Sequence, residues 1–173
     1  MAQILYVTNI IIEPGALTQL AAECARVGIA RPLIVTDAGI RAAGLLDKGL
    51  GALHGLPVAV FDQTPGNPNE AAVRAAAAVY ADGKCDGLIA LGGGSSIDCA
   101  KGVTHVGPLK TYATIEGGSP KITSAVPPLI AVPTTAGTGS EVARGAIVIV
   151  DDGRKLGFHS WHLVPKTAIL DPD

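Results

Sequence analysis

Residues 88–101 read LIALGGGSSIDCAK. A short apolar run delivers three glycines, Gly92, Gly93 and Gly94, to a predicted helix over Ser95–Val106. Glycine has no Cβ, so the main chain can approach a ligand closely at such a turn. A helix N-terminus adds N–H groups and the positive end of the helix dipole, and both suit a pyrophosphate. The stretch therefore predicts a phosphate-binding turn, although a plain glycine turn with Ser95 or Ser96 as helix N-cap fits the same letters.

This turn differs from two common phosphate loops. Its glycines do not have the GxGxxG spacing, and no Gly-Lys-Ser/Thr follows them, which excludes a Walker loop.

Outward from this turn, short apolar runs alternate with helical stretches. The predicted strands are Leu33–Thr36, Val58–Phe61, Leu88–Leu91 and Leu129–Val132. The predicted helices before the glycine turn are Leu17–Val27, Ile40–Leu53 and Glu70–Ala81. The strands are apolar at successive positions, which indicates that helices cover both faces, and the crossovers are long enough for parallel pairing. We expect an α/β fold, a Rossmann-like doubly wound and mostly parallel sheet, in one dinucleotide-binding domain over residues 1–173.

Further strands are predicted before and after these elements. Ile4–Val7 and Ile10–Ile12 are strand-like, residues 107–128 form a looser Gly/Pro region, and Ala146–Val150 is a predicted strand. Lys155–Asp173 is expected to hold two short strands or extended segments. Because the chain stops directly after a strand-like run, we expect a cut between domains there.

Composition excludes several classes of protein. Hydrophobic residues make up 48% and charged residues 16%, which is enough for a core and unlike a disordered chain. The 13 Lys and Arg are scattered among 15 acids, so nucleic acid is not expected as a partner. No apolar run is long enough for a membrane span, and the start is unlike a signal peptide, so we expect a cytoplasmic protein. Cys24, Cys85 and Cys99 are far apart and are expected to be buried, reduced thiols.

Two motifs resemble a known family. GGGSSIDCAK is similar to the GGGSxxDxAK signature of iron-containing (group III) alcohol dehydrogenases, and PTTAGTGSEV at residues 133–142 is similar to their threonine-rich loop. The resemblance covers essentially the whole chain, from Asn9 to Pro172. Dehydroquinate synthases and glycerol dehydrogenases share a GGGxxxD pattern, but the threonine-rich loop fits the alcohol dehydrogenases better. One departure is the turn Glu13-Pro14-Gly15-Ala16, where many relatives have a Phe-Gly-x-Gly type and no charge.

The resemblance implies a dehydroquinate synthase-like N-terminal domain that binds NAD, with NADP less favoured. The implied reaction is hydride transfer between the nicotinamide and a small alcohol or aldehyde. In the family, iron or zinc is held by one Asp and three His of a helical C-terminal domain, and none of those positions falls before Asp173. We therefore expect this chain to bind cofactor without catalysing alone. The family also implies a homodimer or higher oligomer, with Ile4–Ile12 as candidate interface.

The alternatives are of two kinds. One is the half of a dehydroquinate synthase-like or glycerol(-phosphate) dehydrogenase-like enzyme. The other is a stand-alone nucleotide-binding or assembly module.

The resemblance assigns most cofactor contacts to the two motifs. Gly92, Gly93, Gly94 and Ser95 would cradle the pyrophosphate, and Ser96 could also donate a hydroxyl. Thr134, Thr135 and Thr138 would line the adenosine and phosphate side, the alternative being ordinary turn chemistry.

Three charged residues complete the predicted site. Asp37 follows the strand Leu33–Thr36, where a carboxylate can accept from a ribose hydroxyl and repel a 2′-phosphate; it could instead cap the next helix. Asp98 would face the nicotinamide and substrate, its alternative being an ion pair with Lys101 three residues on. Lys155 resembles a lysine near the nicotinamide ribose, its alternative being a surface lysine.

The histidines do not predict a metal site. His159 and His162 have metal-like spacing in HSWH, but no third ligand lies nearby in the sequence, and His54 and His105 stand far from them. We assign no metal ligand in this chain.

Overall fold

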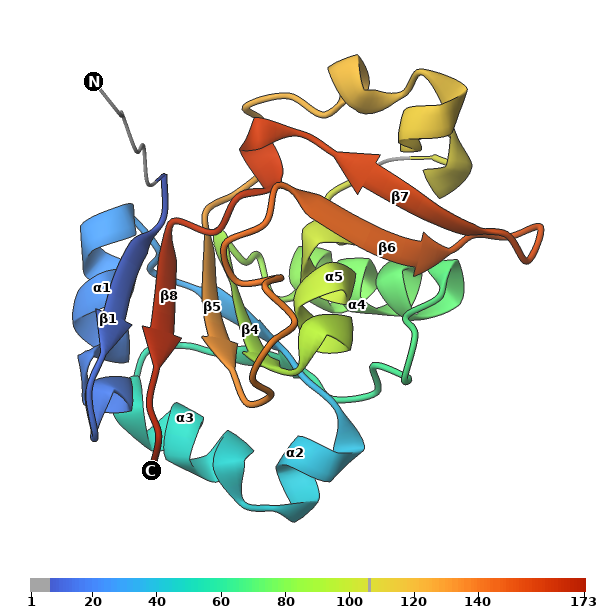
Figure 1. Ribbon diagram of the computed structural model, residues 1–173. Coiled ribbons are helices and arrows are strands. Elements are labelled where there is room, and N and C mark those ends of the chain that lie inside the picture. The colour runs from blue at the N-terminus through green and yellow to red at the C-terminus, as the bar shows by residue number, and fades with distance from the viewer. Residues whose placement is uncertain (1–6, 106) are drawn as a thin grey trace, which may run out of the picture.

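The computed structural model describes residues 7–105 and 107–173. Its centre is a six-stranded, wholly parallel sheet in the order β1-β8-β5-β4-β2-β3 (Figure 1). The strands are β1 (Asn9–Ile12), β2 (Pro32–Val35), β3 (Ala59–Phe61), β4 (Gly87–Gly92), β5 (Leu129–Pro133) and β8 (Thr167–Leu170). The predicted α/β fold with a doubly wound, mostly parallel sheet is confirmed.

Helices pack on both faces of the sheet because the central strands β2, β4 and β5 hold no polar side chain. Ile34, Ile89 and Ile130 are register partners across β2, β4 and β5. They point into one core layer with the helices α1 (Leu20–Val27) and α3 (Leu45–Ala52). Their neighbours Leu33, Leu88 and Leu129 point the other way, into a second layer with α4 (Glu70–Asp82) and α5 (Gly94–Gly102). The alternation of strand side chains divides one continuous apolar run between two cores.

The helices of the structure are α1 (Leu20–Val27), α2 (Ala38–Ala42), α3 (Leu45–Ala52), α4 (Glu70–Asp82) and α5 (Gly94–Gly102). The Asn69 side chain caps α4 by accepting from the Ala72 N–H at 2.9 Å. The prediction of one helix over Ile40–Leu53 was wrong, because Gly44 with φ 75° takes a left-handed conformation between α2 and α3.

Two other helix boundaries differ from the prediction. The stretch Leu17–Val27 begins as a 3₁₀ turn, η1 (Ala16–Gln19), before α1 starts. The helix after the glycine turn begins one residue earlier than expected and ends at Gly102, since the Gly/Pro-rich segment after it does not continue a helix. That segment forms three short 3₁₀ turns, η2 (Leu109–Tyr112), η3 (Thr114–Glu116) and η4 (Ser119–Lys121).

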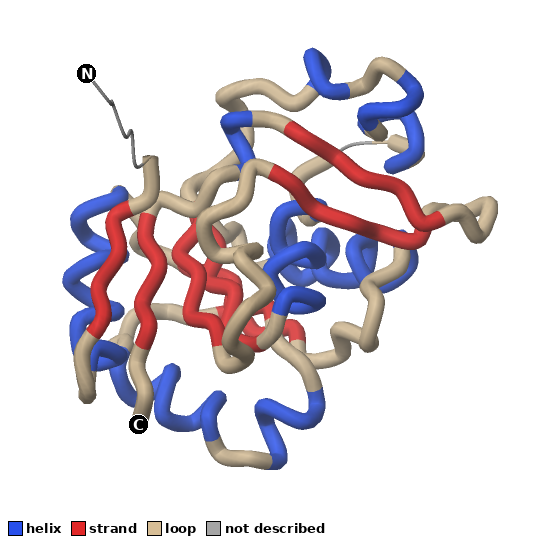
Figure 2. Tube along the Cα trace, in the orientation of Figure 1, coloured by secondary structure: helices blue, strands red, loops and turns tan. Residues whose placement is uncertain are grey.

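Strands β6 (Gly145–Ile149) and β7 (Lys155–His159) form an antiparallel hairpin outside the main sheet. Figure 2 shows this hairpin apart from the parallel strands, and Figure 1 shows it beside α5. After a further 3₁₀ turn, η5 (Trp161–Leu163), the chain returns to the sheet as β8. The two short strands expected after Lys155 are therefore confirmed. Most of the predicted strand Ile4–Val7 lies outside the described residues.

The cysteines are free thiols, as expected, with Cys24 and Cys99 buried and Cys85 half-buried. Burial raises the pKa of Cys24 and of Cys99 to about 11. Across the described part of the chain, every helix is too short or too polar to cross a bilayer.

Candidate functional site

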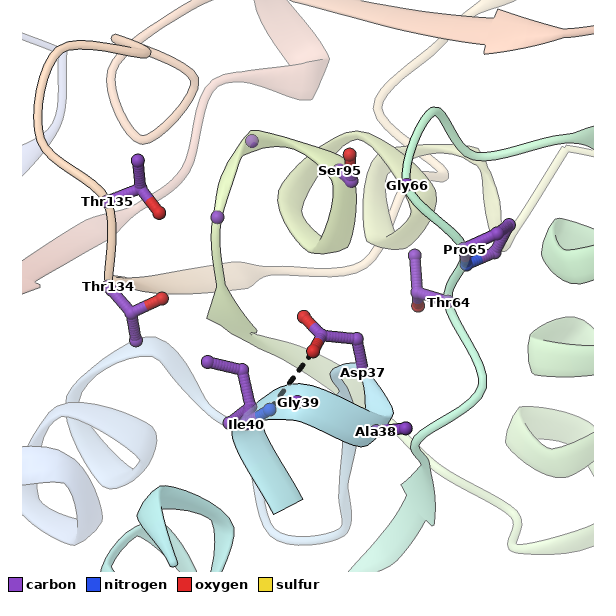
Figure 3. A pocket seen from close by; sticks show the side chains of 12 residues that line it. Asp37, Ala38, Gly39, Ile40, Thr64, Pro65, Gly66, Ser95, Thr134 and Thr135 are labelled. Atoms are coloured by element: carbon purple, nitrogen blue, oxygen red, sulfur yellow. Dashed lines mark hydrogen bonds between the residues drawn. The ribbon is translucent and has the colours of Figure 1, made fainter. Parts of the chain in front are cut away.

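A cavity of about 620 Å³ lies at the carboxyl ends of four parallel strands. Its wall comes from the segments that follow β2, β3, β4 and β5, and Figure 3 shows these segments converging on one space. The lining residues are Asp37, Ala38, Gly39, Ile40, Thr64, Pro65, Gly66, Gly93, Gly94, Ser95, Thr134 and Thr135. A cavity of this size is in the usual range for small-molecule and cofactor sites.

The topology explains why the cavity forms here. The chain leaves β2 for β3 on one side, returns to β4 beside β2, and then continues to β5 on the other side. The segments after β2 and β4 therefore diverge, and ligands of open α/β sheets bind at such a point.

The glycine turn forms the floor next to helix α5. Gly92 has φ 148°, and a Cβ built on it would lie 2.5 Å from the Ser96 hydroxyl, so only glycine fits there. Gly93 is the N-cap of α5 and has no side chain, so the alternative in which Ser95 or Ser96 caps the helix is wrong. The first-turn N–H groups are thus not capped by a side chain, and the helix end faces the cavity that Gly93 and Gly94 line.

Asp37 serves the helix cap and the cavity at once. One carboxylate oxygen accepts from the Ile40 N–H at 3.0 Å, which caps α2. The other accepts from the buried Ser96 hydroxyl at 3.3 Å. In Figure 3 the carboxylate points from the start of α2 into the space beneath the glycine turn. The capping alternative is therefore confirmed, and the same carboxylate lines the cavity.

The threonine loop after β5 packs against the glycine turn. The Thr134 N–H donates to the Gly92 carbonyl at 3.1 Å. A Cβ on Gly93 would lie 3.2 Å from the Thr135 hydroxyl, and one on Gly94 would lie 3.4 Å from Thr138 Cβ. The two motifs pack so closely that any larger residue in the turn would push the loop away.

Asn67 is a site residue that the sequence reasoning missed. Its N–H donates to the Ser95 hydroxyl at 3.2 Å, and its side-chain oxygen accepts from Lys155 Nζ at 2.7 Å. Lys155 is exposed, yet it reaches the loop after β3 from the hairpin. That loop also supplies Thr64, Pro65 and Gly66 to the cavity. Its position directly after a predicted parallel strand was the available signal.

Asp98 lies on the hairpin side of α5. Its Oδ2 accepts from the Ile147 N–H at 3.1 Å. Burial raises its pKa above the usual value, and the Ile147 N–H and the charges of Lys101 and Lys155 act in the opposite direction. The alternative pairing with Lys101 is not the arrangement found, because the Lys101 ammonium donates to three main-chain carbonyls instead.

The unusual turn near the start of the chain is joined to its end. Gly15 has φ 77°, and the Asp171 carboxylate accepts from the N–H groups of Gly15 at 3.0 Å and Leu17 at 2.8 Å. The pKa of Asp171 is lowered, chiefly by the Leu17 N–H. Asp171 also lines a second cavity of about 460 Å³ beside the threonine loop. Glu13 belongs to the same ordered turn, where its carboxylate accepts from Gln19 Nε2 at 2.6 Å.

The histidines lie apart from this site. The His159 ring bonds the Thr114 hydroxyl at 2.9 Å, His162 and His54 are exposed, and His105 packs edge-on against Tyr112 at 4.7 Å. Within residues 7–105 and 107–173, no three His, Cys, Asp or Glu side chains gather in a group that could hold a metal ion.

The sequence profile of one family, described as iron-containing alcohol dehydrogenase, matches residues 7–172. The chain belongs to the iron-containing alcohol dehydrogenase family. It is 63% identical over its whole length to a 4-hydroxybutyrate dehydrogenase of Cupriavidus necator, of which it covers 46%. The chain thus spans about half the length of such relatives.

Solved structures of the iron-containing alcohol dehydrogenase family have the same fold. A crystal structure of a 1,3-propanediol oxidoreductase matches 99% of this chain with TM-score 0.90 and 37% identity, and the chain covers 46% of it. A sulfoacetaldehyde reductase of Bifidobacterium kashiwanohense, solved in complex with NAD+, matches 99% with TM-score 0.86 and 27% identity, again over 46% of that protein.

Proposed function

We propose that this chain is the NAD-binding half of a metal-dependent dehydrogenase that transfers hydride between NAD and a small alcohol or aldehyde. The observation that carries the proposal is the cavity at the carboxyl ends of the parallel strands, with a helix N-terminus and a glycine turn on its floor. The sulfoacetaldehyde reductase with the same fold was solved with NAD+. Residues 1–173 form, in this proposal, the dinucleotide-binding domain.

The glycine turn fits a pyrophosphate. Gly93 and Gly94 leave the main chain bare at the cavity, and the start of α5 has no side-chain cap. The N–H groups of this turn and the Ser95 hydroxyl would hold the phosphates, since a helix N-terminus favours an anion. Gly92 and Ser96 would act indirectly, Gly92 through its backbone conformation and Ser96 through its hydrogen bond to Asp37.

Asp37 favours NAD over NADP in this proposal. Its carboxylate lines the cavity after β2, where it can accept from a ribose 2′-hydroxyl and repel a 2′-phosphate. Thr134, Thr135 and Thr138 would line the adenosine and phosphate side, Thr134 and Thr135 on the cavity wall and Thr138 beside Gly94.

The hairpin side of α5 is the proposed nicotinamide side. Asp98 and Lys155 would lie there, with Lys155 near the ribose and Asp98 toward the substrate. The nicotinamide, when bound, supplies the hydride acceptor. The role of these side chains is to orient it.

The substrate and metal belong to the complete enzyme. The Cupriavidus relative makes 4-hydroxybutyrate the first alcohol to assay in full-length protein. Iron or zinc would be bound by residues outside this chain, so the 173-residue segment is proposed to bind cofactor without turnover.

A fluorescence titration of the purified chain with NADH and with NADPH tests the proposal. Saturable binding that favours NADH is the expected result. Binding of neither nucleotide at millimolar concentration would refute it and favour an assembly module. Alcohol turnover by the isolated segment would refute the statement that it is inactive alone.

We also propose that two copies associate through the N-terminal edge of the sheet. Strand β1 is an edge strand, with Ile10 40% and Ile12 72% exposed. The mass of the chain in solution, compared with that of Ile12→Lys, tests this: a dimer that becomes monomeric in the variant is expected, and a monomeric wild type would refute it.

A further inference from the structure

Lys101, on the last turn of α5, carries a buried charge. Its residue is 1% exposed, and its ammonium donates to the carbonyls of Ser140 at 2.8 Å, Ala143 at 2.8 Å and Gly145 at 2.7 Å. A lysine ammonium has three N–H donors, so these bonds use all of them.

The three carbonyls extend from the end of the threonine loop, at Ser140, to the first residue of β6, Gly145. This segment follows two glycines in left-handed conformation, Gly137 with φ 90° and Gly139 with φ 68°. Residues 134–138 are exposed, so the loop has little apolar packing of its own. The bonds from the Lys101 ammonium hold this segment in place, which apolar packing alone does not.

The same helix connects Lys101 to the glycine turn. Helix α5 begins at Gly94 and reaches Lys101 two turns later. Ser140, one of the three residues that Lys101 bonds, also lies against the glycine turn. A Cβ on Gly94 would lie 3.3 Å from the Ser140 hydroxyl. A shift of the loop therefore changes the wall of the proposed phosphate site directly.

We propose that Lys101 is a positioning residue that holds the threonine loop against the glycine turn, in the place where that loop closes the cofactor cavity. The link to cofactor rests on the proposed function; the holding of the loop does not. Asp98, one turn earlier on the same helix, assists by accepting from the Ile147 N–H at 3.1 Å beyond the loop.

The charge state of Lys101 gives a readout that does not need a variant. Burial lowers the pKa of Lys101 to about 8, while the charges of Asp98 on α5 and Glu141 on the loop act in the opposite direction. Two further groups face this region: Lys155 on β7, which acts on Asp98, and His105, which lines the same small void and whose pKa burial lowers. The charged ammonium bonds all three carbonyls. As pH rises through the pKa it gives way to a neutral amine with two N–H donors, whose lone pair faces the third carbonyl.

Hydrogen–deuterium exchange over residues 134–147 is the test, read as protection factors corrected for the intrinsic rate at each pH. Lys101→Met keeps the shape of the side chain and removes its donors. A hydrogen bond to a charged group shifts an equilibrium by about tenfold or more, so we expect protection in this segment to fall by at least that factor. Lys101→Arg, which keeps charge and donors, should recover part of it. Lys121→Met, at an exposed lysine on η4, is the matched control and should match wild type.

The wild-type chain should lose protection in the same segment between pH 7 and pH 9.5, while β2 and β4 keep theirs. Equal protection of the wild-type segment at both pH values would overturn the proposal, and this measurement remains possible if Lys101→Met does not fold. Equal protection in a folded Lys101→Met would overturn it as well.

NADH affinity adds the link to function. The dissociation constant should rise about tenfold or more in Lys101→Met and stay unchanged in Lys121→Met. A wild-type chain that binds no NADH would refute the proposed function, and the exchange data alone would then decide whether Lys101 holds the loop.

Discussion

Asp37→Asn separates the two tasks of the Asp37 side chain. Asparagine is as good an N-cap as aspartate, so the bond to the Ile40 N–H and the start of α2 should survive. What disappears is one negative charge on the wall of the cavity. The variant therefore tests cofactor choice without unfolding the site.

The expected effect follows from Coulomb's law. Two unit charges about 5 Å apart interact by about 1–3 kcal/mol for an effective dielectric constant of about 20–80. Removing that repulsion from a bound 2′-phosphate should improve NADPH relative to NADH by about 5- to 150-fold.

The assay is the ratio of the NADPH and NADH dissociation constants, measured by nicotinamide fluorescence at pH 7.5 and low salt. Asp47→Asn, in the first turn of α3, makes the same change in net charge away from the cavity and should leave the ratio unchanged. A ratio within twofold of wild type in folded Asp37→Asn would refute the assignment of Asp37 to the ribose. Asp37→Ala should in addition cost about 1 kcal/mol of stability through the lost cap.

Three further outcomes are expected. Gly92→Ala, at φ 148° with its new Cβ 2.5 Å from the Ser96 hydroxyl, should weaken NADH binding at least tenfold and lower Tm; wild-type affinity would refute the role of the turn. Gly118→Ala should lower the free energy of unfolding, measured in urea, by about 1–3 kcal/mol, because its Cβ would overlap main-chain atoms of η2. Gly51→Ala, in open space on a helix, should raise that free energy by about 0.5–1 kcal/mol. The reverse order of the two variants would contradict the packing described. The pKa of Glu23 is lowered from 4.5, chiefly by its bond to an arginine, so its contribution to stability is present above pH 4.5 and is lost as pH falls through the folded value; Glu23→Gln should flatten Tm between pH 6 and pH 3, and an unchanged slope would refute this.

The central strands were predictable from sequence because their apolar runs have one physical explanation. Leu33–Thr36, Leu88–Leu91 and Leu129–Val132 are too short for helices and apolar on both faces, which a buried parallel strand requires. The glycine turn was predictable for the same reason, since three glycines between a strand and a helix have a conformational use.

Other features depend on tertiary contacts that local patterns do not contain. The break at Gly44 was missed because the helical periodicity continues on both sides of it. The bond of Lys155 to Asn67 joins residues 88 positions apart, and neither residue type signals it. The bonds of Lys101 to three carbonyls were missed because an i,i+3 acid offered a simpler local partner.

The pairing of β1 with β8 has a consequence for how the protein is made. Asn9 is the register partner of Thr167, so the first described strand pairs with the last one. At a synthesis rate of about 5–20 residues per second, β1 waits on the order of 10–30 s on the ribosome before its neighbour exists. During that time its isoleucines have no strand to pair with, while β2, β3, β4 and β5 can already assemble in order. Docking of β1 is therefore expected to be the last step in the assembly of this sheet, and the nascent sheet is most exposed to chaperones and to aggregation until β8 emerges.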